Sequence, residues 1–336
     1  MKGALIGFGQ VAQDGHVPAL SRAEGFEVVA VVDASAQRRE AAKQAFPAAR
    51  LYADTSALYA AEKLDFVDVA TPPFLHFEQC LEALRRGAHV LCEKPVVFSS
   101  SEFETLRAEA RKHKRALFPV HNWKYAPILR KWHDLLRSRV IGDLRHIELH
   151  VLRTKPSAVA GAKPGTNWRL ERSKAGGGIL VDHGWHNLYL LTWLMGAAPE
   201  GMDAVLRYPQ GGDADDEASA LLRFPDASAL MHLTWRADRR AQWGVSYGRG
   251  GTIHMLDDRL EVLRSGEPLR VIRFAEKLSG GSSHPEWMQA LMPDFAAACA
   301  HPSVSEPNFE EAGHCAALIE SAYRRFSRKD RESVRA

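Results

Sequence analysis

The tripeptide Glu93-Lys94-Pro95 is where residues suited to chemistry first interrupt an apolar segment. It follows His89-Val90-Leu91-Cys92, which is typical of a short buried strand, and Pro95 cannot continue a central strand. An acid and a lysine are costly to bury unless they are paired. Open α/β sheets bind ligands at the carboxyl ends of their strands, so Lys94 is placed where it could meet a reacting group. The alternative is an exposed loop with a solvated ion pair.

A second polar set lies on an expected helix over residues 179–194. Asp182, His186 and Tyr189 are four and three positions apart, a spacing that places side chains on one helix face. Three hydrogen-bonding side chains on one face suit a hydroxylated substrate, although they could also form a buried structural network. His183 is expected to lie about 100° around the helix and to be structural.

The elements that would position these residues begin with an apolar strand over residues 2–6 and a glycine-rich turn. The turn reads Gly7-Phe8-Gly9-Gln10-Val11-Ala12, with a helical pattern after it. In such a G-x-G-x-x-A pattern the first glycine allows a tight turn and the second lets backbone N–H groups approach a pyrophosphate. The third position needs only a small residue. The sequence therefore predicts a dinucleotide cofactor, with its phosphates at a helix N-terminus.

The next strand, residues 26–32, ends at Asp33. An acid here accepts hydrogen bonds from the adenosine ribose hydroxyls and repels a 2′-phosphate, which favours NAD over NADP. Asp33 could instead cap a helix or close a turn. Arg38 and Arg39 follow, so NADP is possible as well, and Arg38 is counted in the cofactor site.

Strands and helices continue to alternate as far as residue 121. The strand over residues 66–70 runs into Thr71-Pro72-Pro73-Phe74-Leu75-His76, whose prolines turn the chain over the strand ends. Thr71, Pro72 and His76 are therefore included among the cofactor-binding candidates. The alternation predicts a doubly wound parallel sheet, an α/β Rossmann domain over residues 1–121.

After residue 121 the pattern changes to alternating strands, expected over residues 144–154, 218–224, 228–236, 242–247, 252–255 and 259–263. This predicts a C-terminal α+β domain over residues 122–336 with an open, mainly antiparallel sheet. A homodimer or homotetramer would cover the open face. Residues 155–167, rich in Pro, Gly, Ala and Ser, are expected to form a mobile loop over a site.

Length and composition agree with two domains and argue against several classes of partner. The chain has 336 residues, with 44 Lys and Arg against 41 Asp and Glu. The basic residues are scattered apart from residues 324–335, which are typical of a solvated helix end, so no nucleic acid is expected. The four cysteines lack metal-ligand spacing, which favours reduced thiols in a cytoplasm. No apolar run could span a bilayer and no signal peptide precedes the first strand, so we expect no membrane partner.

The chain also resembles the Gfo/Idh/MocA family of oxidoreductases, typified by glucose-fructose oxidoreductase and myo-inositol dehydrogenase. The matching stretches occur in the family's order along most of the chain. They are Gly7-Phe8-Gly9, Thr71-Pro72-Pro73-Phe74-Leu75-His76, Glu93-Lys94-Pro95, Trp168-Arg169 and residues 176–196.

The resemblance implies roles for individual residues. Lys94 would contact the reacting hydroxyl, Glu93 would lie at the nicotinamide ribose, and a cis peptide bond would precede Pro95. Asp182 and His186 would complete a Lys-Asp-His catalytic group. The resemblance also places Asn122 and Arg169 with the cofactor, and adds Lys124 and Trp168 to a substrate site that includes Lys94, Asp182, His186 and Tyr189.

Tyr189 departs from the family pattern, because many sugar and cyclitol dehydrogenases have an aspartate three residues after the histidine. A phenol donates as well as accepts hydrogen bonds and offers a stacking face. This difference favours a modified sugar, an amino sugar or a partly apolar ring over a plain inositol-like substrate.

The expected reaction is hydride transfer between nicotinamide C4 and a carbinol carbon of a carbohydrate-like small molecule. His186 would take the hydroxyl proton with Asp182 orienting it, while Lys94 would stabilise the alkoxide or act as the relay. Either Lys94 or His186 could be the base. No metal is expected, because lysine supplies the positive charge. The alternatives are a glycosidase that uses bound NAD for transient oxidation and a nucleotide-sensing regulator without activity.

Overall fold

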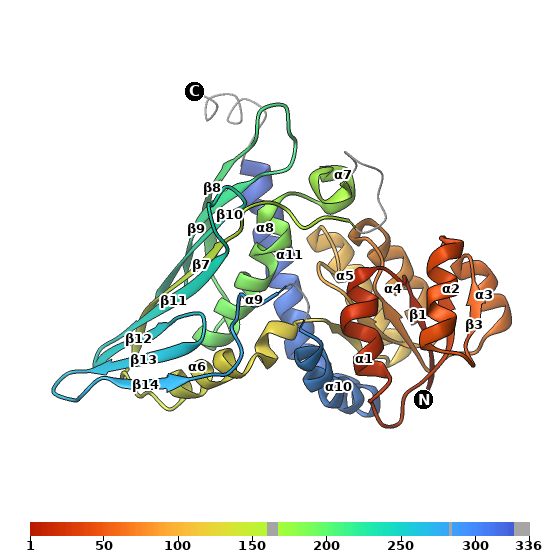
Figure 1. Cartoon of the computed structure of the whole chain (residues 1–336), viewed down its shortest axis with the longest axis horizontal. Coiled ribbons are helices and arrows are strands. Elements are labelled where there is room, and N and C mark those ends of the chain that lie inside the picture. The colour runs from red at the N-terminus through yellow and green to blue at the C-terminus, as the bar shows by residue number, and fades with distance from the viewer. Residues whose placement is uncertain (160–166, 282–283, 326–336) are drawn as a thin grey trace. The chain divides into compact units, whose positions relative to one another are not determined.

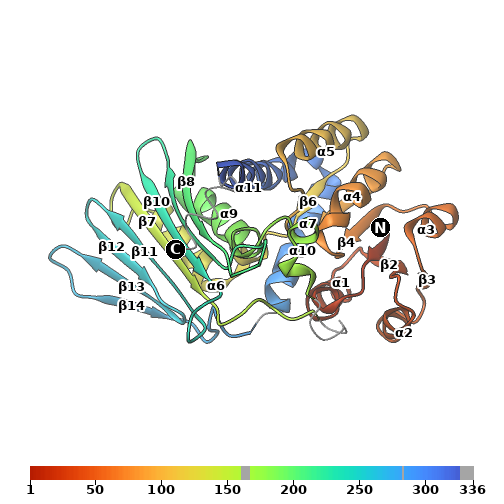
Figure 2. The same cartoon turned by 90° about the horizontal axis from the view of Figure 1, so that it is seen from above.

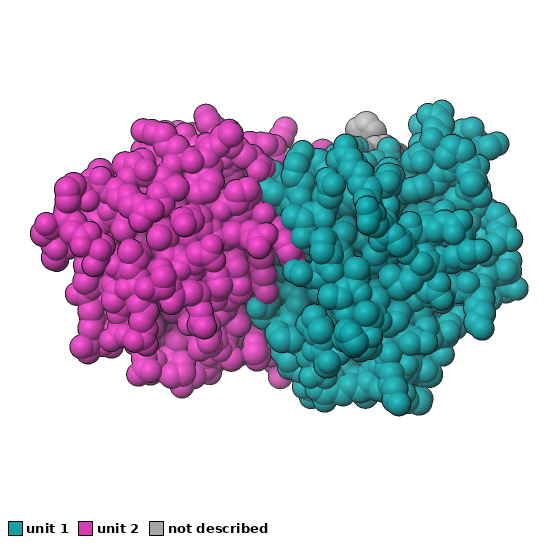
Figure 3. Space-filling view, turned by 90° about the horizontal axis from the view of Figure 1, so that it is seen from below, with its two compact units in different colours: residues 1–122, 159–163, 283–313 teal, residues 123–158, 164–282, 314–336 magenta. Residues whose placement is uncertain are grey.

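The computed structural model describes residues 1–159, 167–281 and 284–325. Most of the expected loop over residues 155–167 and of the basic run over residues 324–335 lies outside these described residues. The chain forms two compact units, coloured separately in Figure 3. Unit 1 comprises residues 1–122, 159–163 and 283–313, and unit 2 comprises residues 123–158, 164–282 and 314–336.

The sheet of unit 1 is parallel, as predicted. Its strands are β1 (Lys2–Ile6), β2 (Glu27–Val32), β3 (Arg50–Tyr52), β4 (Phe66–Val69), β5 (His89–Cys92) and β6 (Leu117–Pro119). The strand order is β3-β2-β1-β4-β5-β6, so the direction of winding reverses between β1 and β4. In doubly wound sheets such a switch point, at the carboxyl ends of the strands, is where ligands bind.

Helices cover both faces of this sheet (Figures 1 and 2). The helices of unit 1 are α1 (Val17–Leu20), α2 (Ala36–Ala45), α3 (Thr55–Ala61), α4 (His76–Arg85), α5 (Ser100–His113) and α10 (Pro285–Ala300). Helix α10 comes from late in the chain, yet it packs beside α1. The Phe295 ring of α10 lies 5.5 Å from that of Phe26 and 5.9 Å from that of Phe118, measured between ring centroids.

The segment after the glycine turn is more complex than the expected helix. It begins as a π-helical turn, η1 (Ala12–His16), and continues as the short helix α1. A π-turn contains one residue more per turn than an α-helix and is often found at functional sites. In this protein the turn ends with a histidine, His16, whose side chain is buried.

The sheet of unit 2 is open and mainly antiparallel, as predicted. Its eight strands lie in the order β14-β13-β12-β11-β7-β10-β9-β8, and only the β7–β10 pair is parallel among the described residues. Their bounds are β7 (Leu144–Leu152), β8 (Gly201–Arg207), β9 (Glu217–Arg223), β10 (Ser228–Thr234), β11 (Ala241–Gly248), β12 (Gly251–Met255), β13 (Arg259–Arg264) and β14 (Arg270–Arg273). The edge strands β8 and β14 were not predicted.

The helices of unit 2 gather on one face of this sheet (Figures 1 and 2). They are α6 (Pro127–Arg137), α7 (Arg172–Ala175), α8 (Ile179–Asp182), α9 (Gly184–Met195) and the second part of α11 (Glu306–Arg325). Trp132 of α6 is buried and donates its indole N–H to the Ser246 hydroxyl of β11 at 3.0 Å. The other face has no helix on it within the described ranges. None of the helices that these ranges form has the length and apolar character needed to cross a membrane.

Candidate active site

The glycine turn after β1 has the geometry of a ligand-binding loop. Gly7 has φ of +92°, and a Cβ added there would lie 2.8 Å from the Ala70 carbonyl, so only glycine fits. At Gly9, by contrast, the nearest described atom to an added Cβ is a nitrogen of Arg38, 4.0 Å away. The second glycine therefore borders open space, as close approach of a phosphate to the backbone would require. Gln10 and Val11, also predicted here, are exposed and lie directly before η1.

Asp33 ties the end of β2 to this turn. Its Oδ2 accepts the Phe8 backbone N–H and its Oδ1 accepts the Ser35 backbone N–H, both at 2.8 Å. The Asp33 side chain is only 8% exposed, and the guanidinium of Arg38 lies 3.8 Å from Oδ2. The predicted acid and the predicted Arg38 thus lie together beside Phe8. Such a set could hold an adenosine ribose, and Arg38 adds a positive charge next to it.

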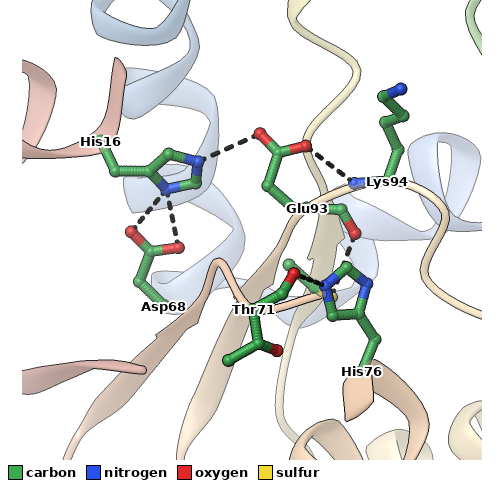
Figure 4. Close-up of polar contacts among 7 residues, drawn as sticks. His16, Asp68, Thr71, His76, Glu93 and Lys94 are labelled. Carbon is green, nitrogen blue, oxygen red and sulfur yellow. Dashed lines mark hydrogen bonds and ion pairs between the residues drawn. The ribbon is translucent and has the colours of Figure 1, made fainter. Parts of the chain in front are cut away.

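The loops that follow β4 and β5 are linked by His76, the first residue of α4 (Figure 4). Its Nδ1 lies 2.8 Å from the Pro95 carbonyl oxygen and its Nε2 lies 2.7 Å from that of Thr71. A neutral ring can donate to only one of these acceptors at a time; burial lowers the pKa of His76 despite them. The Lys94–Pro95 peptide bond is cis, as the resemblance implied. Pro72 precedes the 3₁₀ turn η2 (Pro73–Leu75).

Two residues that the sequence analysis did not select join Glu93 in a buried network (Figure 4). His16 Nδ1 lies 3.0 and 2.8 Å from the two carboxylate oxygens of Asp68 in β4. His16 Nε2 lies 3.1 Å from Glu93 Oε1. The other Glu93 oxygen, Oε2, accepts the backbone N–H of Lys94 at 3.1 Å. A continuous line of contacts therefore runs from Asp68 through His16 and Glu93 to the backbone of Lys94.

Charge stabilises this network. Burial alone would lower the pKa of His16, but the charges and hydrogen bonds of Asp68 and Glu93 outweigh it and raise the pKa to about 10. Burial likewise opposes ionisation of Glu93, yet the hydrogen bond and charge of His16, together with Lys94, lower the pKa of this carboxyl below its ordinary value. At neutral pH His16 is therefore a buried cation and Glu93 a carboxylate.

One of these residues carries a signal in the sequence. Asp68 is the only acid in the apolar strand Phe66–Val69 and is fully buried there, where an unpaired acid is rarely tolerated. His16 has no such signal. Its inward orientation depends on the π-turn η1, which the pattern of apolar residues does not reveal.

The polar set predicted on one helix is divided between two helices in unit 2. The helix breaks at His183, which ends α8 and begins α9. Asp182 lies against this residue, with Oδ2 3.3 Å from His183 Nδ1. His186 Nδ1 lies 2.9 Å from the Tyr189 hydroxyl, so His186 and Tyr189 of α9 are brought together as predicted.

Trp123 and Lys124 complete the surroundings of His186 and Tyr189. The Tyr189 hydroxyl accepts the Trp123 backbone N–H at 3.2 Å, and the Trp123 ring stacks on His186 with centroids 4.5 Å apart. The Lys124 ammonium lies 6.0 Å from the centre of the Tyr189 ring. Tyr189 is fully buried, so its hydroxyl is committed to these neighbours.

The remaining predicted residues lie in both units. The Arg169 guanidinium stacks over the Trp168 ring at 4.4 Å, in the 3₁₀ turn η4 (Trp168–Leu170) of unit 2. Asn122 is the last residue of the first segment of unit 1. Lys94 belongs to unit 1, whereas Asp182 and His186 belong to unit 2. Across the described ranges, no three His, Cys, Asp or Glu side chains form a group that could hold a metal ion.

Comparison with known proteins identifies the family. Residues 1–121 match the Gfo/Idh/MocA family model described as an oxidoreductase family with an NAD-binding Rossmann fold, and residues 129–254 match the model of its C-terminal domain. A candidate UDP-kanosamine synthase oxidoreductase subunit from Amycolatopsis mediterranei (strain S699) is 35% identical over 201 residues, which are 59% of this chain and 52% of that protein. The D-glucoside 3-dehydrogenase of Escherichia coli (strain K12) is 30% identical over 193 residues, 57% of this chain and 53% of that protein.

The chain spans about half the length of these two relatives. Among solved structures, levoglucosan dehydrogenase in complex with NADH has a TM-score of 0.81 and 21% identity, and the match covers 96% of this chain and 97% of that one. The two units therefore share the fold of this structure along almost the whole chain. With both of its family models matched in sequence, the chain belongs to the Gfo/Idh/MocA family of NAD-binding oxidoreductases.

Proposed function

We propose that the protein is an NAD-dependent oxidoreductase that transfers a hydride between nicotinamide and a carbinol or keto carbon of a sugar, amino sugar or cyclitol-like substrate. The observation that carries this proposal is the position of Lys94. It follows β5 at the carboxyl ends of the parallel strands, next to the switch point, and its backbone N–H is held by the partly buried carboxylate of Glu93. The names of the relatives, which include a glucoside dehydrogenase, support a carbohydrate-like substrate.

Most of the cofactor site would lie in residues 1–121 and most of the substrate site in residues 122–336. The turn Gly7-Phe8-Gly9 with Gln10 and Val11 would hold the pyrophosphate, since Gly9 borders open space. Asp33 would bind the adenosine ribose and favour NAD. The neighbouring Arg38 could pair with a 2′-phosphate and so allow some binding of NADP. Thr71, Pro72, His76 and Glu93 would line the nicotinamide end, with Asn122 and Arg169.

When bound, the nicotinamide accepts or supplies the hydride. Lys94 would contact the reacting hydroxyl and stabilise the alkoxide by its positive charge. His186 Nδ1 contacts the Tyr189 hydroxyl, so we assign proton exchange with the substrate to Nε2. Tyr189 would thereby orient His186, a role different from the direct substrate contact expected from the sequence. Asp182 is kept as the third member of the catalytic group, with Lys124 and Trp168 binding the substrate.

We further propose that a second copy of the chain covers the open sheet face of unit 2. That face carries exposed apolar side chains on several strands, namely Val205, Leu221, Tyr247 and Leu263. Scattered exposed apolar residues are common, but a row of them on one sheet face favours an interface. Light scattering coupled to gel filtration tests this: a monomer at micromolar concentration would contradict it.

A cytoplasmic location is supported by the four buried, unbridged cysteines.

The reaction itself is tested by a panel of sugars, amino sugars and cyclitols mixed with the protein and NAD, with NADH absorbance as the readout. We expect NADH to form with at least one member of the panel and more slowly with NADP. Release of a sugar from a glycoside without net NADH would support the glycosidase alternative. Tight NADH binding with no turnover across the panel would contradict the proposal and favour a sensor.

A further inference from the structure

The Glu93 carboxylate is held at both of its oxygens. Oε1 contacts the imidazole of His16, and Oε2 accepts the backbone N–H of the next residue, Lys94 (Figure 4). His16 is in turn held by both oxygens of Asp68. His16 and Asp68 are 1% and 0% exposed, so neither is oriented by solvent. The orientation of Glu93 is thus determined by residues from three separate segments, η1, β4 and the end of β5.

Each member of this line depends on the next for its charge. A buried carboxylate without a cation would take up a proton or turn away, and a buried imidazolium without a carboxylate would lose its proton. The charges that act on His16 come from β4, as Asp68, and from the end of β5, as Glu93. The result is an imidazolium between two carboxylates, directly before the lysine.

We propose that Asp68 and His16 are positioning residues for Lys94, which they hold through the Glu93 carboxylate. This inference rests on the catalytic role proposed for Lys94. The two contacts of Glu93 fix its side chain and the peptide plane of Lys94, and therefore the point from which the lysine side chain starts. Because η1 directly follows the glycine turn, the same network joins the cofactor loop to the catalytic strand end.

Two variants, His16→Gln and Asp68→Asn, test the contacts of His16 with Glu93 and with Asp68 separately. Glutamine keeps a donor near Glu93 but carries no charge, so we expect kcat to fall about 10- to 100-fold, as for a small displacement of a reacting group. We expect the KM for NAD to change less than about 3-fold. His113→Gln is the matched control, because His113 makes a partly exposed contact with Glu109 in α5 of the same unit. It should behave as the unaltered protein.

Asp68→Asn distinguishes positioning through charge from a purely structural role, because only the former should change how activity depends on pH. An amide can still accept the Nδ1 proton of His16 but no longer favours the cation, so His16 should lose its charge as the pH rises. We expect the activity of this variant, relative to the unaltered protein, to fall about 10-fold between pH 6 and pH 9. A ratio that stays flat over this range would overturn the proposal.

Nuclear magnetic resonance of protein labelled with ¹⁵N at histidine and lysine tests the network without any substrate. We expect the two His16 ring nitrogens to have imidazolium shifts at pH 8, and the Lys94 amide to lose its hydrogen-bond shift in His16→Gln. A neutral His16 ring, or an unchanged chemical shift of the Lys94 amide, would overturn the positioning role of His16 and Asp68 but not the proposed function. If these shifts are as expected while Lys94→Ala remains fully active, the proposed function fails, and with it the positioning role.

Discussion

Two histidines, one in each unit, are held in opposite ways. His16 of unit 1 lies between the carboxylates of Asp68 and Glu93, and these raise its pKa to about 10. His186 of unit 2 contacts the Tyr189 hydroxyl and stacks on the Trp123 ring. A histidine held between two carboxylates stays charged and is suited to holding other groups in place. A histidine beside a phenol is suited to exchanging a proton, which is the task that we assign to His186.

The largest effect is expected when His186, the histidine to which we assign proton exchange, is replaced. His186→Asn should lower kcat about 100- to 10,000-fold, since a positioned general base contributes that much, while NADH binding is retained. Stopped-flow absorbance with an active member of the substrate panel and NADH fluorescence give the two readouts. His254→Asn in β12 serves as the matched control. A loss of less than 10-fold in His186→Asn would assign the base to Lys94 instead.

The charge of His16 should affect how the free energy of unfolding depends on pH. A His16 with a folded-state pKa near 10 and an ordinary pKa near 6.5 when unfolded contributes stability that is complete below about pH 6.5. That contribution is lost as the pH rises towards 10, by about 1.4 kcal/mol per pH unit. Urea unfolding at pH 7 and pH 9 should show this fall in the unaltered protein and a smaller fall in His16→Gln. Equal falls would contradict the charged state assigned to His16.

A smaller effect on activity is expected when Tyr189, which contacts His186 in unit 2, is changed. Tyr189→Phe removes the hydroxyl that contacts His186 and the Trp123 backbone N–H. Of the two lost hydrogen bonds, the one to His186 bears on the reaction, and its loss should lower kcat/KM about 3- to 10-fold. Tyr59→Phe is the matched control, since this buried hydroxyl has no hydrogen-bond partner among the described residues. If Tyr189→Phe retains full activity over pH 6–9, Tyr189 does not orient the histidine.

The last expected effect concerns the cofactor preference in unit 1 and not the rate of the reaction. Asp33→Ala removes the carboxylate that accepts the Phe8 and Ser35 N–H groups and faces the expected ribose site. The ratio of kcat/KM for NAD to that for NADP should fall by about 10-fold, because Arg38 remains to meet a 2′-phosphate. Asp54→Ala, which removes the cap of α3 in the same unit, is the control. An unchanged ratio would mean that Asp33 only holds the turn together.

Sequence periodicity was sufficient for the two sheets and insufficient for some of their details. The parallel sheet of unit 1 and the mainly antiparallel sheet of unit 2 were predicted because buried and alternating strands differ in pattern. The strands β8 and β14 were missed. Strand β14 buries none of its residues, whereas β8 buries Met202 and Leu206, an alternation that the sequence analysis overlooked. The helix over residues 179–194 was predicted without its break at His183.

The site shows a similar division. The glycine turn, Asp33 and the residues after β5 stand out because their types conflict with a buried strand or suit a phosphate. Asp68 was overlooked although a buried acid in β4 is informative. His16 could not be found from spacing, because only the π-turn of η1 directs it towards Asp68 and Glu93. Pairings that depend on an irregular turn are determined by tertiary packing.

The most direct test of the proposed reaction is Lys94→Ala, compared with Lys112→Ala on the exposed side of α5. NADH formation with an active sugar and NADH binding by fluorescence would be measured for both variants. We predict that Lys94→Ala binds NADH with an affinity within about 3-fold of the unaltered protein and loses at least 100-fold in kcat, while Lys112→Ala is unchanged. Full turnover by Lys94→Ala would contradict the role of Lys94 and the mechanism built on it.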